Sequence, residues 1–246
     1  MAKIFGMCGK KQCGKNSLCN FFKELLPNAR VIEFAFAKAL KDLAVWRFNI
    51  PSKSCHGSDA DKNYPIATWG KFFSDEILNK YKKQNDSLLS GREFLQMLGT
   101  DILREGNRNG FRYSSDINTL FNWLDEKLGC RALDPTYNFK NIWTDILVED
   151  ISRASDSYDI ITVSDVRFFN EIDAIKSVDG KLIRLYRDAK TTNSIPHPSE
   201  LEMEQMQDSL FDYILYEDKN VVLSDLRIFA TNILMNENLL GGGALV

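Results

Sequence analysis

A run of glycine and lysine near the N-terminus is the first part of the chain whose residue types could do chemistry. Residues 9–15 read Gly-Lys-Lys-Gln-Cys-Gly-Lys and match the first seven positions of the phosphate-binding pattern G-x-x-x-x-G-K-S/T. In such a loop the glycines let backbone N–H groups converge on phosphate oxygens, and the lysine reaches the terminal phosphates. The residues predicted to bind a nucleotide are Gly9, Lys10, Lys11, Gln12, Cys13, Gly14, Lys15, Asn16 and Ser17.

Lys15 is also the predicted catalytic residue of this loop, because its ammonium group can neutralise charge on a transferring phosphoryl group. The alternative is a lysine-rich surface turn, but the apolar run before the loop and the helical pattern after it favour phosphate binding. One position departs from the pattern. The hydroxyl residue that would bind Mg²⁺ is expected directly after the lysine, yet Asn16 stands there and Ser17 follows it. Ser17 is therefore the candidate metal ligand of the loop, one position late.

A second charged group follows the third predicted strand. Asp165 and Arg167 come directly after the apolar run 159–164, and ligands of open α/β sheets bind at the carboxyl ends of the strands. We expect Asp165 to hold Mg²⁺ or its waters and Arg167 to hold an acceptor phosphate in a bidentate fork, which makes both candidate catalytic residues. The alternative is a salt bridge between the two that caps the strand.

Other charged candidates lie further from the loop. Arg92 and Gln96 are four residues apart on a predicted helix, so they share one face and could grip an acceptor's phosphate and base; a solvated helix face is the alternative. Lys38 and Lys41 follow the second predicted strand, near the same sheet edge. Arg187 belongs to a basic segment that could close over a triphosphate, although a solvated charged loop is equally consistent with it.

Apolar runs outline the scaffold that must position these residues. Runs rich in branched and aromatic side chains occur at 3–8, 30–34, 159–164, 181–186 and 212–216. Five strands separated by helices predict an α/β fold of the P-loop NTPase kind, in which helices flank a five-stranded parallel sheet on both faces.

The expected organisation is one domain over residues 1–240. Within it, residues 36–157 are predicted to be an inserted helical region that binds the acceptor, and residues 187–205 a short lid-like segment. Residues 241–246, with three consecutive glycines, are expected to be a disordered tail. The insertion has helical patterns near 38–48, 65–83, 92–104, 115–129 and 141–155, and polar, breaker-rich loops at 51–64 and 105–114.

Composition narrows the classes of partner. The net charge of −3 argues against binding a polymeric phosphate backbone, so no nucleic-acid partner is expected. No apolar stretch approaches the roughly 20 residues that span a bilayer, and the N-terminus lacks the apolar run of a secretory signal, so no membrane partner is expected. Five cysteines without C-x-x-C spacing are read as free thiols in a reducing cytoplasm, and two histidines do not make a zinc site.

Taken in order, several segments resemble the deoxynucleoside monophosphate kinases of tailed bacteriophages, which are similar to adenylate kinase in fold. The resemblance spans residues 1 to about 230. It is carried by Gly14-Lys15-Asn16-Ser17, Phe36-Ala37-Lys38-Ala39-Leu40-Lys41, Arg92, Gln96, Gly99-Thr100-Asp101, Trp143, Asp165-Val166-Arg167, Glu171 and Arg187. Members of that family also tend to have an acidic or amide residue directly after the loop lysine, with a hydroxyl residue following.

The resemblance implies a reaction in which ATP and a deoxynucleoside monophosphate (dNMP), with Mg²⁺, give ADP and the deoxynucleoside diphosphate. It implies Arg187 as a catalytic residue and Ala37, Lys38, Lys41, Arg92, Gln96, Trp143, Arg167 and Glu171 as acceptor contacts. Trp143 and Glu171 are the weaker of these, because the first could only pack and the second could only orient Arg167. The resemblance is also compatible with a homodimer, and a phage-encoded protein would act in the host cytoplasm.

Two other functions fit parts of the pattern. Phosphomevalonate-type kinases share a similar phosphate loop and a similar Phe-Ala…Leu-Lys segment, so the acceptor could be another small phosphorylated molecule. A P-loop protein could also bind a nucleotide to switch a partner without phosphorylating an acceptor. A switch protein of this kind would hydrolyse ATP slowly, with no stimulation by an acceptor.

Overall fold

The computed structural model describes residues 1–10, 13–107, 109–134, 136–187, 198–217 and 223–240 of the 246-residue chain. The chain divides into two compact units. Unit 1 comprises Met1–Phe36 and Asp150–Val246, and unit 2 comprises Ala37–Glu149. This division does not test the predicted single domain over 1–240 or the boundaries of its insertion at 36–157, so these stay predictions. None of the helices in the described ranges is long and apolar enough to cross a membrane.

A five-stranded sheet is the centre of unit 1, and every neighbouring pair of its strands is parallel. The strand order is β2-β5-β1-β6-β7. This arrangement confirms the predicted α/β fold with a five-stranded parallel sheet. The strands are β1 Lys3–Gly9, β2 Val31–Phe34, β5 Ile160–Val166, β6 Lys181–Arg187 and β7 Tyr213–Glu217.

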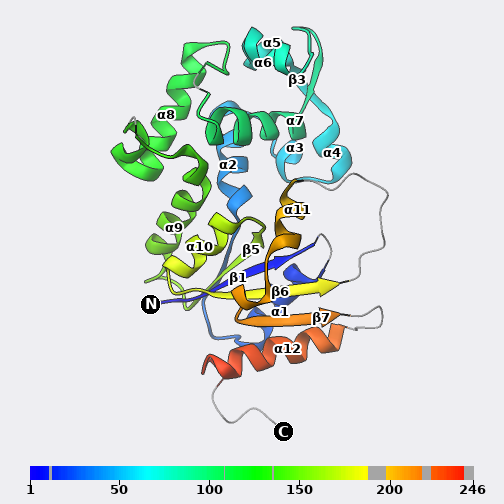
Figure 1. Cartoon of the computed structure of the whole chain (residues 1–246), viewed down its shortest axis with the longest axis vertical. Helices are drawn as coiled ribbons and strands as arrows, with labels where there is room; N and C mark the ends of the chain where they lie inside the picture. The colour runs from blue at the N-terminus through cyan, green and yellow to red at the C-terminus, as the bar shows by residue number, and fades with distance from the viewer. Residues whose placement is uncertain (11–12, 108, 135, 188–197, 218–222, 241–246) are drawn as a thin grey trace. The chain divides into compact units, whose positions relative to one another are not determined.

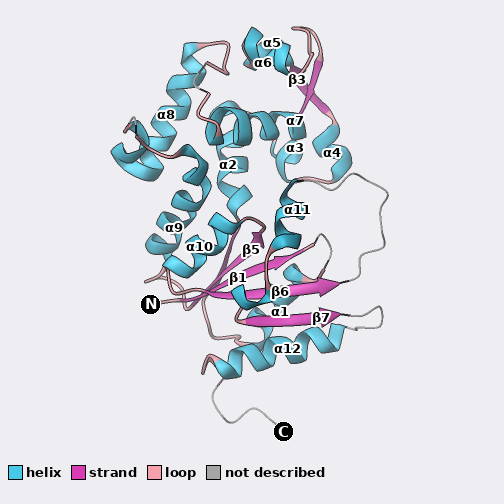
Figure 2. Cartoon of the chain, viewed as in Figure 1, coloured by secondary structure: helices cyan, strands magenta, loops and turns pink. Residues whose placement is uncertain are grey.

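Helices cover both faces of this sheet, as Figures 1 and 2 show. On one face, Phe5 and Met7 of β1 are fully buried in a core shared with the first and last helices of unit 1. On the other face Gly6 approaches Ile175 so closely that a Cβ there would lie 3.0 Å from the isoleucine side chain. Burial on both faces explains why β1 is a continuous apolar run rather than an alternating one. The helices are α1 Lys15–Leu25, α10 Phe169–Ser177, α11 Pro198–Gln205 and α12 Leu223–Asn236, with a short 3₁₀-helix at Asp208–Leu210.

Unit 2 is mostly helical, with a small antiparallel pair of strands, β3 and β4. The chain passes between the units within two helices: α2 begins at the last residue of the first segment of unit 1, and α9 begins in unit 2 and ends in unit 1. The elements are α2 Phe36–Phe48, α3 Ser52–His56, α4 Asp59–Asn63, β3 Pro65–Thr68, α5 Trp69–Phe72, α6 Asp75–Lys80, β4 Leu88–Ser90, α7 Gly91–Gln96, a π-helix Met97–Arg104, α8 Ser114–Leu128, 3₁₀-helices Gly129–Leu133 and Phe139–Asn141, and α9 Ile142–Ala154.

Aromatic side chains form much of the core of unit 2. Phe72 and Phe94 meet edge to face with their ring centroids 4.9 Å apart, and Phe48 stacks on Phe111 at 5.2 Å. Trp69 is buried beside them, and its ring lies 5.5 Å from that of Phe73. Such rings bury large apolar areas and favour these offset and perpendicular geometries. The unit therefore has a core of its own.

Two predictions for the insertion are wrong in detail. The segment 51–64, predicted as a loop, contains α3 and α4, because Ser58 and Asp61 form a reciprocal capping box that starts α4. The predicted helix at 65–83 begins instead with strand β3, whose first residue is Pro65. Proline is acceptable at the first position of a strand, where its missing N–H costs little. The other four predicted helices in the insertion have counterparts in the structure: α2, α7 with the π-helix, α8 and α9.

Candidate functional site

Two glycines set the path of the phosphate loop, which we define as residues 9–17. A Cβ at Gly9 would lie 2.5 Å from the Cys13 sulfur and 2.7 Å from the carbonyl oxygen of Leu185, so only glycine fits where β1 ends. Gly14 has a φ of +100°, a conformation that other residues adopt only with strain. The two positions that the pattern requires to be glycine are thus the two where the backbone requires it. Lys11 and Gln12, predicted to bind the nucleotide, lie outside the described residues.

The ammonium group of Lys15 lies over this loop. Its Nζ donates to the carbonyl oxygens of Gly9 at 2.5 Å and of Lys10 at 2.8 Å, and it lies 3.4 Å from the Cys13 sulfur. The two carbonyl groups are uncharged, so neither of them neutralises the positive charge that Lys15 brings to the loop.

The start of α1 carries further positive potential. Its N-cap is Gly14, which has no side chain to satisfy the first backbone N–H groups, and the first turn has no acidic residue. Helix N-termini leave their first N–H groups without intrahelical partners, and the helix dipole adds a partial positive charge. An uncapped helix end behind a glycine loop is a binding site for phosphate groups. Asn16 is exposed and Ser17 partly buried in this first turn.

The thiols below the loop are not reactive groups. Cys8 is fully buried, and burial raises its pKa to about 11 against the opposing effects of the Arg184 and Lys15 charges. Cys13 is 1% exposed. All five cysteines are described and free, and only Cys130 is exposed. The thiols beside the loop therefore serve as small apolar side chains.

Strand register brings the Asp165–Arg167 segment to the same edge of the sheet as the loop. Cys8 of β1 pairs with Val166, the last residue of β5, so Gly9, which ends β1, and Arg167, which follows β5, lie at the same edge. Asp165 Oδ1 accepts a hydrogen bond of 2.8 Å from the N–H of Phe36, the first residue of α2. The Arg167 side chain is partly buried, and its guanidinium has no hydrogen bond or ion pair with the residues that the structure describes.

Glu171 holds the turn after β5. Its side chain is 2% exposed, and Oε2 accepts hydrogen bonds from the N–H groups of Arg167 at 2.7 Å and Phe168 at 3.1 Å. A carboxylate that accepts from two backbone N–H groups fixes the backbone of the residues it holds. Glu171 thus holds the backbone at Arg167 and Phe168, while its predicted roles in orienting Arg167 and as an acceptor contact stay predictions.

The fourth predicted strand also ends at this edge. Gly9 of β1 pairs with Leu185 of β6, and Arg187 is the last residue of β6. Of the predicted lid-like segment, residues 188–197 lie outside the described residues, and so does the predicted tail at 241–246. Lys10 of the loop forms an ion pair of 2.7 Å with Glu204 of α11. Sequence reasoning missed Glu204, because a glutamate in a polar helix gives no signal of a partner nearly 200 residues away.

In unit 2, Arg92 and Gln96 are both exposed on α7. Arg92 donates from Nε to Asn63 Oδ1 at 2.8 Å and pairs with Asp59 at 2.8 Å, both in α4. The guanidinium is therefore held in one orientation at the surface of the unit. Its two partners were not predicted; the polar run at 58–63 was read as a loop.

The remaining predicted acceptor contacts divide into surface and core positions. Lys38 of α2 forms an ion pair of 2.5 Å with Asp42, and Ala37 and Lys41 are partly buried in the same helix. Trp143 is 6% exposed, and its indole N–H donates to the carbonyl oxygen of Gly99 at 3.3 Å. Trp143 thus occupies a core position that supports the π-helix, and contact with an acceptor stays a prediction for all four.

The chain is similar to a known protein along most of its length. No family model matches the chain. A protein of Acanthamoeba polyphaga mimivirus, provisionally named deoxynucleotide monophosphate kinase, is 25% identical over 219 residues, which cover 89% of this chain and 90% of that protein. The chain is similar to a nucleotide kinase. A match over that share of the chain includes parts of both units, so the similarity is not limited to the phosphate loop.

Proposed function

We propose that the protein transfers the γ-phosphoryl group of ATP to a deoxynucleoside 5'-monophosphate, giving ADP and the deoxynucleoside diphosphate. The observation that carries this proposal is the phosphate loop, where two obligatory glycines lead into an uncapped helix and a lysine lies across the turn. The name of the mimiviral relative supports the choice of acceptor.

The geometry of the loop supports the binding of ATP. The β- and γ-phosphate oxygens take the place of the Gly9 and Lys10 carbonyl oxygens as partners of the Lys15 ammonium group. Charge-assisted hydrogen bonds to phosphate are stronger than those to a neutral carbonyl. The first N–H groups of α1 hold the remaining phosphate oxygens.

In the transfer step, an oxygen of the acceptor phosphate forms a bond to the γ-phosphorus of ATP while the bond to the β–γ bridging oxygen breaks. The electron pair of that bond stays with ADP. No general base is needed, because the acceptor phosphate is already ionised at neutral pH. Lys15, Arg167 and Arg187 neutralise charge on the transferring group and align the two reactants, which is the main contribution a protein makes to this chemistry.

The residues present fit a magnesium ion. Mg²⁺ prefers oxygen ligands, keeps several waters, and is bound through one or two side chains together with substrate phosphates. Ser17 and Asp165 offer a hydroxyl and a carboxylate oxygen of that kind, and the described residues contain no cluster of three or more metal-binding side chains. The ion supplies further neutralisation of the phosphate charge when it is bound.

Candidate roles in recognition of the acceptor are assigned within each unit separately, beginning with unit 2. Arg92, held by Asp59 and Asn63, presents a fixed guanidinium to a phosphate, and Gln96 offers its amide to the base. Lys41 adds positive charge. Lys38 and Ala37 are secondary contacts, and Trp143 acts by supporting the π-helix at Gly99. In unit 1, Arg167 holds the acceptor phosphate and Glu171 orients Arg167.

The test is ADP formation from ATP and Mg²⁺ with a panel of dTMP, dGMP, dCMP, dAMP and phosphomevalonate, each compared with ATP alone. Stimulation by one or more dNMPs supports the proposal. Stimulation by phosphomevalonate alone would assign another acceptor, and slow hydrolysis unaffected by every acceptor would favour a nucleotide-dependent switch. The mass of the protein in solution, measured by light scattering, tests the predicted homodimer.

A further inference from the structure

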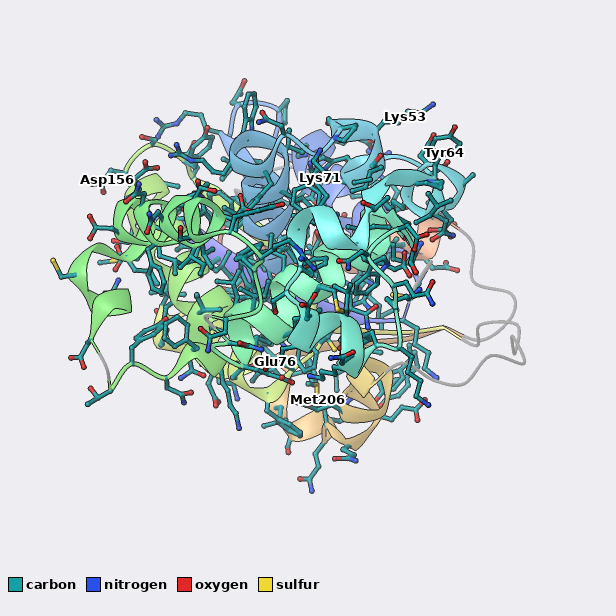
Figure 3. All side chains as sticks on the ribbon, turned by 90° about the horizontal axis from the view of Figure 1, so that it is seen from above. Lys53, Tyr64, Lys71, Glu76, Asp156 and Met206 are labelled. Atoms are coloured by element: carbon teal, nitrogen blue, oxygen red, sulfur yellow. The ribbon has the colours of Figure 1, made fainter. Side chains whose placement is uncertain are left out.

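Helix α11 is held firmly at its C-terminal end. Arg184 of β6 is 5% exposed, and its guanidinium donates to the carbonyl oxygens of Met203, at 3.0 Å, and of Met206. The charge also lies 3.5 Å from a carboxylate oxygen of Asp208. A cation at the C-terminus of a helix is favourable because it complements both the free carbonyls and the helix dipole. Met206, just beyond this end of α11, is labelled in Figure 3.

This anchor fixes α11 relative to the strand that leads into the phosphate loop. Arg184 of β6 pairs in register with Cys8 of β1, one residue before the loop begins at Gly9. The position of Glu204 is therefore set by buried contacts rather than by its own surface pair. Two carboxylates of α11 contact neighbouring elements of unit 1. Glu204 forms an ion pair with Lys10 at 2.7 Å, and Glu202 accepts a hydrogen bond from the N–H of Phe169 at 3.0 Å.

The contact at Lys10 conflicts with the function proposed for the loop. Lys10 is the first of three lysines in residues 9–15, and it adds to the positive potential that a triphosphate needs. The Glu204 carboxylate forms an ion pair with Lys10 and so neutralises that charge. It also places a negative charge beside the loop. Lys10 and Glu204 are 46% and 53% exposed, so a ligand can reach both of them.

We propose that Glu204 is an internal competitor of the nucleotide. Its carboxylate forms an ion pair with Lys10 while no nucleotide is bound. When ATP binds, its phosphates replace the Glu204 carboxylate as the partner of Lys10. This inference rests on the proposed function. The exchange is feasible because an exposed ion pair contributes little free energy, whereas the triphosphate carries several charges to the same ammonium group. Glu204 thus lowers the affinity of the loop for any nucleotide, with the largest effect on those that carry the most negative charge.

The experiment measures the Kd of ATP and of ADP by calorimetry for the full-length protein and for Glu204→Gln. The variant is expected to bind ATP about three- to tenfold more tightly at low salt, with a smaller gain for ADP and a smaller gain again at high salt. Glu24→Gln is the matched control. It also removes one negative charge and a surface ion pair, with Arg227 at 4.0 Å, but at the far end of α1.

A second pair of variants tests whether the effect runs through Lys10. In a Lys10→Met background, Glu204→Gln should give little or no further increase in the affinity for ATP, because the Lys10 ammonium group, for which the carboxylate and the nucleotide compete, is absent. Equal affinities in wild type and Glu204→Gln, weaker binding by Glu204→Gln, or a full gain that persists without Lys10 would each overturn the inference while leaving the kinase proposal intact. Wild-type protein that binds no nucleotide at all would instead overturn the proposed function, and this inference with it.

Discussion

The ammonium group of Lys15 lies 2.5 Å from the carbonyl oxygen of Gly9, so the side chain of the first residue of α1 is hydrogen-bonded to the backbone of the last residue of β1. If the proposed function is correct, the ammonium group of Lys15 is already held beside the loop before a phosphate arrives. A site that is organised before its ligand arrives loses less entropy on binding.

Replacing Lys15 with methionine should lower turnover about a hundred- to a thousandfold, because it removes charge that the transferring phosphoryl group needs. The apolar length of the side chain is kept, so the unfolding transition should change little. Steady-state ADP formation and thermal unfolding check the two parts. Lys23→Met, at the exposed end of α1, is the control, and near-normal turnover by Lys15→Met would contradict the role.

Gly9→Ala should destabilise unit 1 and abolish ATP binding. Its Cβ would meet the Leu185 carbonyl oxygen at 2.7 Å, and this backbone atom cannot move aside easily. We expect a loss of about 2–3 kcal/mol in free energy of unfolding, as for other strained or overpacked sites. Gly129→Ala is the comparison, because Gly129 also has a positive φ but nothing lies within 4 Å of the added Cβ. Urea denaturation should show the larger loss for Gly9.

Arg184→Leu should cost roughly 3 kcal/mol in the free energy of unfolding, since it leaves the carbonyl oxygens of Met203 and Met206 without their buried donor. Arg227→Leu, which removes an exposed pair with Glu24, should change that free energy by less than about 1 kcal/mol. Equal effects in urea denaturation would show that Arg184 is not an anchor.

Asp208 should make the free energy of unfolding depend on pH in the acid range. Hydrogen bonds from Tyr186 and Tyr216, together with the nearby Arg184 charge, lower its pKa below the ordinary value of 3.8. A group with a lowered pKa in the folded state stabilises the protein above its unfolded pKa and loses that contribution as pH falls through the folded pKa. The difference in unfolding free energy between wild type and Asp208→Asn should thus be largest above pH 5 and shrink below pH 4. A difference that grows as the pH falls would contradict the assignment.

Arg92→Ala should raise the KM for the acceptor more than the KM for ATP, by about tenfold or more, because a charge-assisted fork to phosphate is lost. Arg47→Ala, which removes an exposed pair with Glu126, should leave both constants unchanged. Initial rates at varied acceptor and fixed ATP, and the reverse, separate the two. Equal changes in both KM values would place Arg92 outside acceptor binding.

The sheet and the loop could be predicted because their signals are local and strong. Each strand of unit 1 lies in a segment rich in branched and aromatic side chains, and the loop repeats a known spacing of glycine and lysine. The short elements at 51–68 were missed, although Ser58 and Asp61 already had the spacing of a capping box. Short helices carry too few residues for a hydrophobic period to stand out.

The contacts around α11 could not be predicted for a different reason. Arg184 donates to backbone carbonyl oxygens. Because every residue has a backbone carbonyl, the residue types at the partner positions do not indicate this contact. The pairing of Lys10 with Glu204 depends on this anchor in turn. Only the folded chain shows that a glutamate from the polar C-terminal part of the sequence lies beside the loop.

The distribution of thiol exposure gives the protein a natural attachment point for a spectroscopic probe. Four cysteines are buried, two of them at or beside the phosphate loop, while Cys130 alone faces solvent in unit 2. A maleimide dye added at neutral pH should label Cys130 first and leave the loop intact. Fluorescence from that single site would report on the surroundings of Cys130 in unit 2 of an otherwise wild-type chain.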